Sequence, residues 1–274
     1  ARPGGTPISG RVSRLGRESL AALRARAAAL DTEPALVELA EALRRDSRAG
    51  AKALADRCER RAGALGKERA RLALLFAYRR QLRERGVRLV AGVDEVGVGP
   101  LAGPVVAAAV VLPDEPELPG LNDSKKLSRA KRERLAEAIR CQAVDWKVGV
   151  AWPGEIDRLN IYHASLLAMR RAVEALSPHP DHVLVDARTI PGIRTPQTPL
   201  VRGDSRDASI AAASIVAKVH RDAIMLQLDA RFPAYGFARN MGYPTPQHME
   251  ALERVGASVV HRRSFAPVAR AARA

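Results

Sequence analysis

The chain of 274 residues has little of what marks several common protein classes. Its only two cysteines, Cys58 and Cys141, make at most one disulfide and lack a metal-binding spacing, which argues against a disulfide scaffold and a zinc site. No run of about 18 apolar residues exists, and the first residues, ARPGGTPISG, lack a hydrophobic signal region. We therefore expect a cytoplasmic globular protein with reduced thiols and no membrane segment.

Acidic residues are scarce in the first third of the chain. Residues 1–89 hold 21 Lys and Arg against 10 Asp and Glu, which leaves 24 against 20 for the rest of a chain with a net charge of +15. A basic segment favours a polyanionic partner such as nucleic acid. The same Arg-rich and Ala-rich composition also follows from a coding bias, and the sequence leaves both interpretations open.

Helical spacing of apolar residues runs from Arg17 to about Arg85, where Gly86 ends it. Asp31–Pro34 has the pattern of a helix cap and first turn, and Asp46–Gly50 that of a stop between two helices. Because short amphipathic helices need packing partners, we expect residues 1–86 to form a basic, all-helical extension.

Strand-like apolar runs begin after this extension. They are expected at 87–93, 105–112, 146–151, 182–185 and, less clearly, 199–202, with helices at 128–140, 155–176 and 205–231. Strands first and strand-helix alternation later predict an α/β domain over residues 87–274, with a mixed sheet flanked by helices.

Two adjacent carboxylates, Asp94 and Glu95, lie between an apolar run and a glycine-rich turn within Val90–Pro100. Neighbouring side chains of a strand point to opposite faces, so this pair shares one ion only if the strand twists or ends there. The glycines and Pro100 permit such a break. For an arbitrary sequence, a solvated turn is the simpler interpretation.

Two further acids follow probable structural boundaries. Asp186 ends the apolar run 182–185, where ligands of α/β sheets gather. Asp204 precedes a long helix, so by itself a helix N-cap is the favoured interpretation.

The stretch GVDEVGVGPLAGPVV from Gly92 resembles the signature of the type 2 ribonucleases H, the ribonuclease HII family. Similar blocks follow in the same order between about residues 88 and 268: NDSKKLS, VLVDA, GDSRDASIAAASIVAKVHRD, YGFARNMGYPTPQH and HRRSFAPV. The chain departs from the family pattern at Val98, where an arginine is usual, and at Met241, where a lysine is usual.

The resemblance implies a ribonuclease H-like fold and assigns catalytic, metal-binding roles to Asp94, Glu95, Asp186 and Asp204. Four carboxylates without a His or Cys cluster suit a hard cation, so we expect Mg²⁺ or Mn²⁺ in a two-metal site. Without metal, the crowded carboxylates should repel one another and raise some of their pKa values.

Substrate contacts are also implied by the resemblance. Phosphate contacts are expected from Ser124, Lys125, Ser209, Ser214 and Lys218, and recognition of the ribose from Gly97, Val98, Gly99 and Tyr243. Backbone contacts of the Gly97–Gly99 turn can survive the loss of an arginine side chain at position 98, whereas a charged contact cannot. Asp207 and Asp222 are assigned to capping or surface interactions.

These features predict a metal-dependent endonuclease that hydrolyses the RNA strand of RNA/DNA hybrids and incises at ribonucleotides embedded in duplex DNA. Its expected partner is nucleic acid and its expected state a monomer; Ala266–Ala274 shows no recognisable peptide for a sliding clamp. One alternative is a hybrid-cleaving enzyme that ignores single ribonucleotides because Val98 replaces arginine. Another is a catalytically weak nucleic-acid-binding protein.

Overall fold

A computed structural model describes residues 18–114 and 116–271 of the chain. The described residues divide into two compact units, one that ends at Ala73 and one that begins at Leu74. The outer ends of both predicted domains, and the end of the segment Ala266–Ala274, lie outside the described residues. In the described part, no helix is long and apolar enough to cross a membrane.

The first unit is helical, as predicted. It contains α2 (Leu20–Ala29), α3 (Glu33–Arg44) and most of α4 (Ala49–Leu75). Leucines and alanines of the three helices form its core, among them Leu23, Leu36 and Leu54. Arg44 of α3 pairs with Asp56 and Glu59 of α4. The helices therefore stabilise one another through a shared apolar core, and part of the basic charge is neutralised within the unit.

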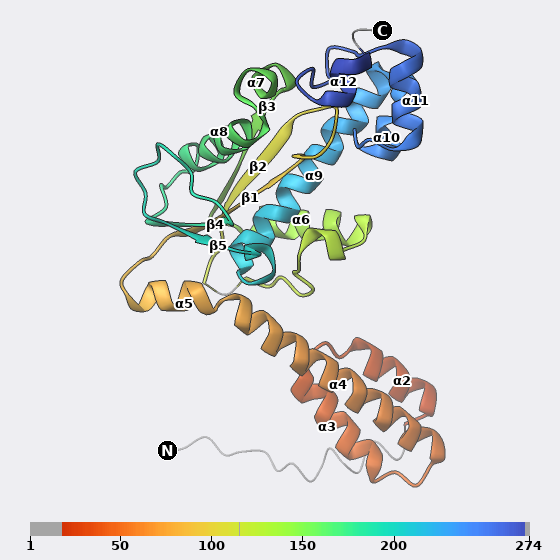
Figure 1. Cartoon of the computed structure of the whole chain (residues 1–274). Coiled ribbons are helices and arrows are strands. Elements are labelled where there is room, and N and C mark those ends of the chain that lie inside the picture. The colour runs from red at the N-terminus through yellow and green to blue at the C-terminus, as the bar shows by residue number, and fades with distance from the viewer. Residues whose placement is uncertain (1–17, 115, 272–274) are drawn as a thin grey trace. The chain divides into compact units, whose positions relative to one another are not determined.

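The second unit alternates strands and helices (Figure 1). In chain order its elements are α5 (Ala77–Glu84), β1 (Val90–Val96), β2 (Val105–Val111), η1 (Ser124–Lys126), α6 (Arg129–Gln142), β3 (Asp145–Ala151), α7 (Pro153–Leu159), α8 (Ile161–Glu174), β4 (His182–Asp186), β5 (Gln197–Leu200), η2 (Gly203–Ser205), α9 (Ala208–Arg231), η3 (Pro233–Tyr235), α10 (Phe237–Asn240), α11 (Pro246–Val255) and α12 (Ala266–Ala271).

The five strands form one mixed sheet in the order β3-β2-β1-β4-β5. β1 pairs antiparallel with β2 and parallel with β4, and β4 pairs parallel with β5. This confirms the predicted α/β class. β1 is the central strand, and it joins the β2–β3 half of the sheet to the β4–β5 half.

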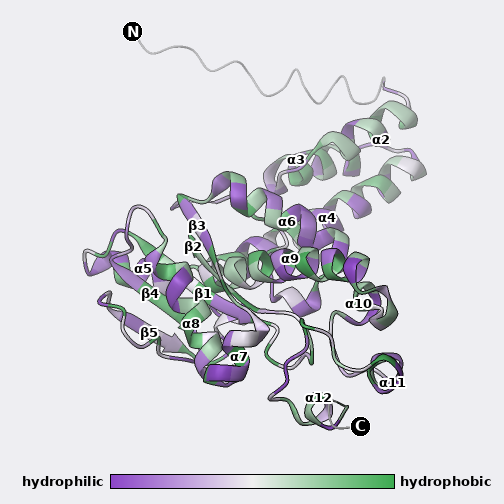
Figure 2. Ribbon diagram, turned by 90° about the horizontal axis from the view of Figure 1, so that it is seen from above, coloured by the Kyte–Doolittle hydropathy of each residue, from purple (hydrophilic) through white to green (hydrophobic). Residues whose placement is uncertain are grey.

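Each face of the sheet packs against a long helix. Ala91 and Val93 of β1 belong to a core cluster with Ala164 and Ala168 of α8. Val90 lies on the other face, in a cluster with Ile210 of α9. Figure 1 shows α8 and α9 on the two sides of β1 and β2, and Figure 2 shows hydrophilic and hydrophobic segments alternating along the helices, as in amphipathic helices.

The helix α5 belongs to the second unit, although the sequence placed the boundary after Gly86. Tyr78 and Leu82 pack against the cluster that contains Val90. Arg79 is buried and donates hydrogen bonds to the Leu112 and Pro113 carbonyls at the end of β2. These contacts join α5 to the sheet, and periodicity along the chain does not reveal them.

Two predicted elements differ from the structure. The helix expected over 155–176 is two helices, α7 and α8, because Asn160 adopts φ +65° and caps α8 through its side chain. The uncertain strand near 199–202 lies at Gln197–Leu200, and Arg202 follows it with φ +56°. Both residues leave the ordinary backbone regions at a point where the chain must turn.

Glycine at position 92 permits the close approach of β1 and α9. A Cβ atom there would lie 2.1 Å from the Ser209 carbonyl carbon and 2.2 Å from the Ile210 nitrogen. We therefore expect Gly92→Ala to lower the free energy of unfolding by about 3 kcal/mol or more in urea titrations, because neither backbone can move without disturbing the core.

The matched control is Gly154→Ala in α7, where no atom lies within 4 Å of the added Cβ. Its free energy of unfolding should stay within about 1 kcal/mol of the wild-type value. Equal stability of the two variants would contradict the close packing of α9 on β1.

Candidate active site

Asp94 and Glu95 lie within β1 and point to opposite faces of the sheet, as neighbouring strand residues do. Asp94 faces α9, where the hydroxyl of Ser214 hydrogen-bonds its carboxylate. Glu95 faces the α8 side, where its Oε1 lies 3.2 Å from Nη2 of Arg188. The strand does not end between the two acids, so a third group must connect the two faces.

Asp186 occupies that position. β1 and β4 run parallel with Val93 opposite Val185, so the next residues, Asp94 and Asp186, lie level at the carboxyl ends of adjacent strands. The charge of Asp186 raises the pKa of both Asp94 and Glu95. Its Oδ1 accepts a hydrogen bond of 2.7 Å from the Gly203 backbone N–H. This bond joins the end of β4 to the turn that carries Asp204.

Asp204 is buried in η2, before α9 begins. It is not the N-cap of α9: that role belongs to Asp207, whose Oδ1 accepts from the backbone N–H groups of Ser209 at 2.8 Å and Ile210 at 3.1 Å. The N-cap interpretation of Asp204 is therefore wrong, and the capping role assigned to Asp207 is correct. Asp204 is free to face Asp186 and Asp123, whose charges both raise its pKa.

Burial and like charges together perturb this group of acids. Burial is the largest cause of the raised pKa of Asp94, Glu95 and Asp204, followed by repulsion from neighbouring carboxylates. For Glu95, the guanidinium of Arg188 opposes the rise. Lys125 lowers the pKa of both Glu95 and Asp204, which places its positive charge near both sides of the site.

The acids fit a divalent cation chemically. Glu95 Oε2 is buried with no hydrogen-bond partner, although a carboxylate oxygen excluded from water needs a proton donor or a cation. Oxygen donors alone are what Mg²⁺ and Mn²⁺ prefer. Within residues 18–114 and 116–271, no three acid, His or Cys side chains already converge around one point. One oxygen of Asp186 accepts from Gly203 and one oxygen of Glu95 pairs with Arg188, which leaves the second oxygen of each carboxylate for a cation.

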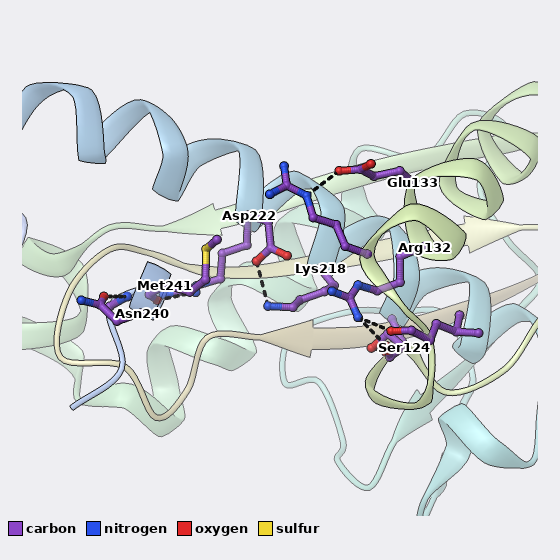
Figure 3. Close-up of polar contacts among 12 residues, drawn as sticks. Ser124, Arg132, Glu133, Lys218, Asp222, Asn240 and Met241 are labelled. Atoms are coloured by element: carbon purple, nitrogen blue, oxygen red, sulfur yellow. Dashed lines mark hydrogen bonds and ion pairs between the residues drawn. The ribbon is translucent and has the colours of Figure 1, made fainter. Parts of the chain in front are cut away.

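Two predicted substrate ligands, Ser124 and Ser214, are buried and bonded to each other. Their Oγ atoms lie 2.8 Å apart. Because Ser214 donates to the Asp94 carboxylate, the hydroxyl of Ser124 must donate to Ser214. Arg132 donates to the Ser124 carbonyl at 3.1 Å and fixes this loop against α6 (Figure 3). In the structure, the two hydroxyls hold the Asp94 carboxylate in position. A contact between either serine and a phosphate stays a prediction.

The other predicted phosphate ligands differ in accessibility. Lys125 is exposed on η1, next to the acids. Lys218 of α9 is partly buried and pairs with Asp222 at 2.7 Å, as Figure 3 shows. Ser209 is fully buried against Gly92 of β1. The Ser209 hydroxyl has no hydrogen-bond partner among the described residues, and a phosphate contact from Ser209 stays a prediction.

The predicted ribose-recognising residues come together on another side of the site. Gly97 has φ +91° and starts the turn after β1, while the side chain of Val98 packs against the apolar core. The exposed ring of Tyr243 lies beside Gly99, where an added Cβ would be 3.7 Å from Cε1 of the tyrosine. The turn and the tyrosine thus form one surface, although 144 positions separate Gly99 from Tyr243.

A chain of buried polar groups supports the Tyr243 segment from behind. The backbone N–H of Ser258 donates to Nδ1 of His261, so the hydrogen of that ring is on Nε2 and is directed at Nε2 of His248, 3.1 Å away. Nδ1 of His248 then donates to the Tyr243 carbonyl at 2.8 Å. Both imidazoles must be neutral for this chain to exist.

Sequence reasoning missed these histidines, Arg188, Asp123 and two buried arginines, Arg221 and Arg262. Arg221 and Arg262 are fully buried and donate to backbone carbonyls around the Gly97 turn. All of these residues except Arg188 lie in the sequence blocks that resemble the ribonuclease HII family, and their place in those blocks could have identified them as candidates. Arg188 had a different signal, since it follows Asp186 by two residues at the end of the same strand.

Removal of one buried charge should stabilise the metal-free protein. We expect Asp94→Asn to raise the free energy of unfolding by about 1–2 kcal/mol at pH 8, because it removes a buried carboxylate that Glu95 and Asp186 repel. Added Mg²⁺ or Mn²⁺ should raise the melting temperature of the wild type more than that of the variant.

Asp222→Asn is the control, since Asp222 is already paired with Lys218. It should not stabilise the protein. A lower melting temperature for metal-free Asp94→Asn than for the wild type would be inconsistent with repulsion among the acids.

The histidine chain predicts a loss of stability in acid. Burial, and then the nearby His248, lower the pKa of His261 to about 4. The unfolded chain protonates this histidine near pH 6.5, so stability is complete above that pH and falls, by about 3 kcal/mol at most, as the pH drops towards 4. His261→Gln should flatten this slope in urea titrations, whereas His179→Gln, at an exposed site, should not. Identical slopes for the wild type and His261→Gln would refute this account.

Comparison with known proteins gives a consistent result. The model of the ribonuclease HII family matches residues 91–268. Ribonuclease HII of Anaeromyxobacter sp. (strain Fw109-5) is 53% identical over 255 residues, which cover 93% of this chain and 80% of that protein. Ribonuclease HII of Myxococcus xanthus (strain DK1622) is 55% identical over 236 residues, covering 86% and 80%.

Solved structures share the fold. Ribonuclease H2 from Pyrococcus horikoshii OT3 is 26% identical with a TM-score of 0.59, covering 68% of this chain and 98% of its own. RNase HII from Archaeoglobus fulgidus, solved in complex with PCNA, is 29% identical with a TM-score of 0.56, covering 65% and 95%. The chain therefore belongs to the ribonuclease HII family, metal-dependent endonucleases that hydrolyse the RNA strand of RNA/DNA hybrids.

Proposed function

We propose that this protein, beyond cutting the RNA strand of hybrids, incises duplex DNA at single embedded ribonucleotides and leaves 3′-hydroxyl and 5′-phosphate ends. The observation that carries the proposal is the position of Tyr243, whose exposed ring lies beside Gly99. A ring packed against one sugar and backbone groups beside it can detect a 2′-hydroxyl, the group that separates RNA from DNA.

Asp94, Glu95, Asp186 and Asp204 are the proposed ligands of two divalent ions. The unpartnered Oε2 of Glu95 and the mutual repulsion among the acids support this assignment. Ions held there would activate a water molecule for attack on phosphorus and stabilise charge on the leaving 3′ oxygen. No side-chain nucleophile is needed. The hydroxyls of Ser124 and Ser214 keep Asp94 in place for this work.

The cations around the acids have separate proposed roles. Lys125 is exposed and near both Glu95 and Asp204, so it suits a phosphate adjacent to the scissile bond. Arg188 pairs with Glu95 and stacks over Tyr162 at 5.3 Å, which suits a residue that orients a ligand rather than one that binds substrate. Lys218 can reach phosphate only after it leaves Asp222.

A second candidate function is hybrid cleavage without recognition of a single ribonucleotide. The side chain of Val98 supports it, since this residue packs on the apolar core and offers no charge to a phosphate. A binding protein with weak catalysis is the third candidate, but no acid of the proposed metal set is missing. In the cell, we propose that the protein acts in the cytoplasm, as a monomer, in the removal of ribonucleotides from DNA.

Three substrates of one length distinguish these functions: a duplex with one ribonucleotide, a uniform hybrid and an all-DNA duplex. With Mg²⁺ or Mn²⁺, we expect cleavage of the first two and not of the third, and sealing of the nicked product by a DNA ligase would verify its ends. Asp94→Asn should reduce the rate by at least about a hundredfold because it removes a metal ligand.

Each other outcome selects another candidate. Cleavage of the hybrid alone supports the enzyme without single-ribonucleotide recognition, and binding without metal-dependent cleavage supports the binding protein. Cleavage of the all-DNA duplex at a comparable rate would defeat the proposed recognition of ribose.

A further inference from the structure

Arg262 is fully buried, and its guanidinium donates hydrogen bonds to the backbone around the turn after β1. Its Nη2 donates to the Gly97 carbonyl at 2.6 Å, Nη1 to Val98 at 3.0 Å and Nε to Gly103 at 3.0 Å. Among the described residues it forms no ion pair. Its charge is thus solvated by carbonyl dipoles that lie 159 to 165 positions away in the sequence.

Arg221 of α9 does the same for the adjoining segments. It is fully buried and donates to the carbonyls of Ala102 at 3.2 Å, Pro104 at 3.0 Å and Met241 at 3.0 Å. Within the described part of the chain it also lacks an ion-pair partner. Figure 3 shows Met241 and Asn240, the residues that precede Gly242 and Tyr243.

The two guanidiniums therefore connect three segments: 97–98, 102–104 and 241. Burial lowers the pKa of Arg221 to about 10 and that of Arg262 to about 9, and repulsion from Arg221 contributes to the latter. A buried cation without an anionic partner is costly for a fold. The structure offsets this cost with hydrogen bonds that all end on the same small region.

Close contacts show how tightly this region is built. A Cβ at Gly97 would lie 2.3 Å from Nε of Arg221, and one at Gly242 would lie 2.5 Å from the Ala102 carbonyl oxygen. The Leu101 N–H donates to the Gly242 carbonyl at 2.8 Å, which joins the turn directly to the Tyr243 segment. The Gly97 and Val98 carbonyls are thus held by donors from inside the protein, without a charged side chain at position 98.

We propose that Arg221 and Arg262 are positioning residues for ribose recognition: they hold the Gly97–Gly99 turn and the Tyr243 segment in the one arrangement that detects a single 2′-hydroxyl. The inference rests on the proposed incision at embedded ribonucleotides. It assigns specificity to two buried cations rather than to an exposed one at position 98.

A uniform hybrid and a single ribonucleotide test this role differently. Every nucleotide in the RNA strand of the hybrid carries a 2′-hydroxyl. A Gly97–Gly99 turn that is imprecisely positioned therefore still meets one at a cleavable bond. The single ribonucleotide presents one. In Arg262→Lys and Arg221→Lys, the ammonium group of lysine replaces the planar guanidinium of arginine. The ammonium group cannot donate hydrogen bonds to all three backbone carbonyls at once. We expect kcat/KM for the single-ribonucleotide duplex to fall at least about tenfold more than that for the hybrid, mostly in kcat.

Arg79→Lys is the matched control. Arg79 is also buried and donates to two backbone carbonyls, those of Leu112 and Pro113, but at the other end of β2. It should lose stability comparably while keeping the wild-type ratio of the two substrates. A ratio within about twofold of wild type in both arginine variants, or an equal change in Arg79→Lys, overturns the proposal.

Two further outcomes are separable. If the wild type does not cleave the single-ribonucleotide duplex, the proposed function fails before the arginines are tested. If the lysine variants do not fold, amide hydrogen exchange of the wild type decides: the backbone N–H groups of Leu101 and Gly103 should be strongly protected without substrate. Exchange as fast as in the exposed loop at Gly192 overturns the positioning role.

Discussion

The parallel pairing of β1 with β4 is the constraint on which the candidate active site depends. It sets Val93 opposite Val185, so the carboxylates that follow, Asp94 and Asp186, meet at one edge of the sheet. Asp186 in turn accepts from the Gly203 N–H and draws in the turn that carries Asp204. A slip of β4 by one residue would send Asp186 to the other face and separate the acids. The two long helices, which pack on opposite faces of β1, exclude that slip because each face already has its own core cluster.

This arrangement concentrates negative charge where water is excluded. Burial and mutual repulsion raise the pKa of Asp94, Glu95 and Asp204. In the metal-free protein, the rest of the fold must therefore offset the electrostatic cost of keeping these carboxylates together. Local groups offset part of the penalty: Ser214 bonds Asp94, Arg188 pairs with Glu95, and Lys125 acts on both Glu95 and Asp204. The partners are too few to satisfy every oxygen, as the orphaned Oε2 of Glu95 shows. Oxygen donors of this kind fit a divalent cation such as Mg²⁺ or Mn²⁺.

At the turn after β1, the buried charges are positive instead of negative. There the positive charges of Arg221 and Arg262 are buried, and the exposed ring of Tyr243 lies beside Gly99. Arg221 and Arg262 lie beneath the turn, and the His261–His248 chain ends on the Tyr243 carbonyl. The exposed cations that the family pattern favours at positions 98 and 241 are absent, yet the backbone geometry is fixed by buried donors. The candidate metal ligands and the turn proposed to recognise ribose thus occupy opposite ends of one short segment, Asp94 to Gly99.

The sequence by itself determined what is local. Continuous apolar runs predicted the strands, the motif from Gly92 to Val106 contained the family-like acids, and the helical extension followed from spacing alone. Even the helix break at Asn160 had a local signal, because asparagine tolerates a positive φ and caps helices. Tertiary structure alone decided that Ser209 is buried under Gly92, that α5 belongs with the sheet, and that two distant arginines bind the turn. The physical reason is that burial and hydrogen-bond partnership depend on residues far apart in the sequence, up to 165 positions for Arg262 and Gly97, whereas periodicity and capping involve only near neighbours.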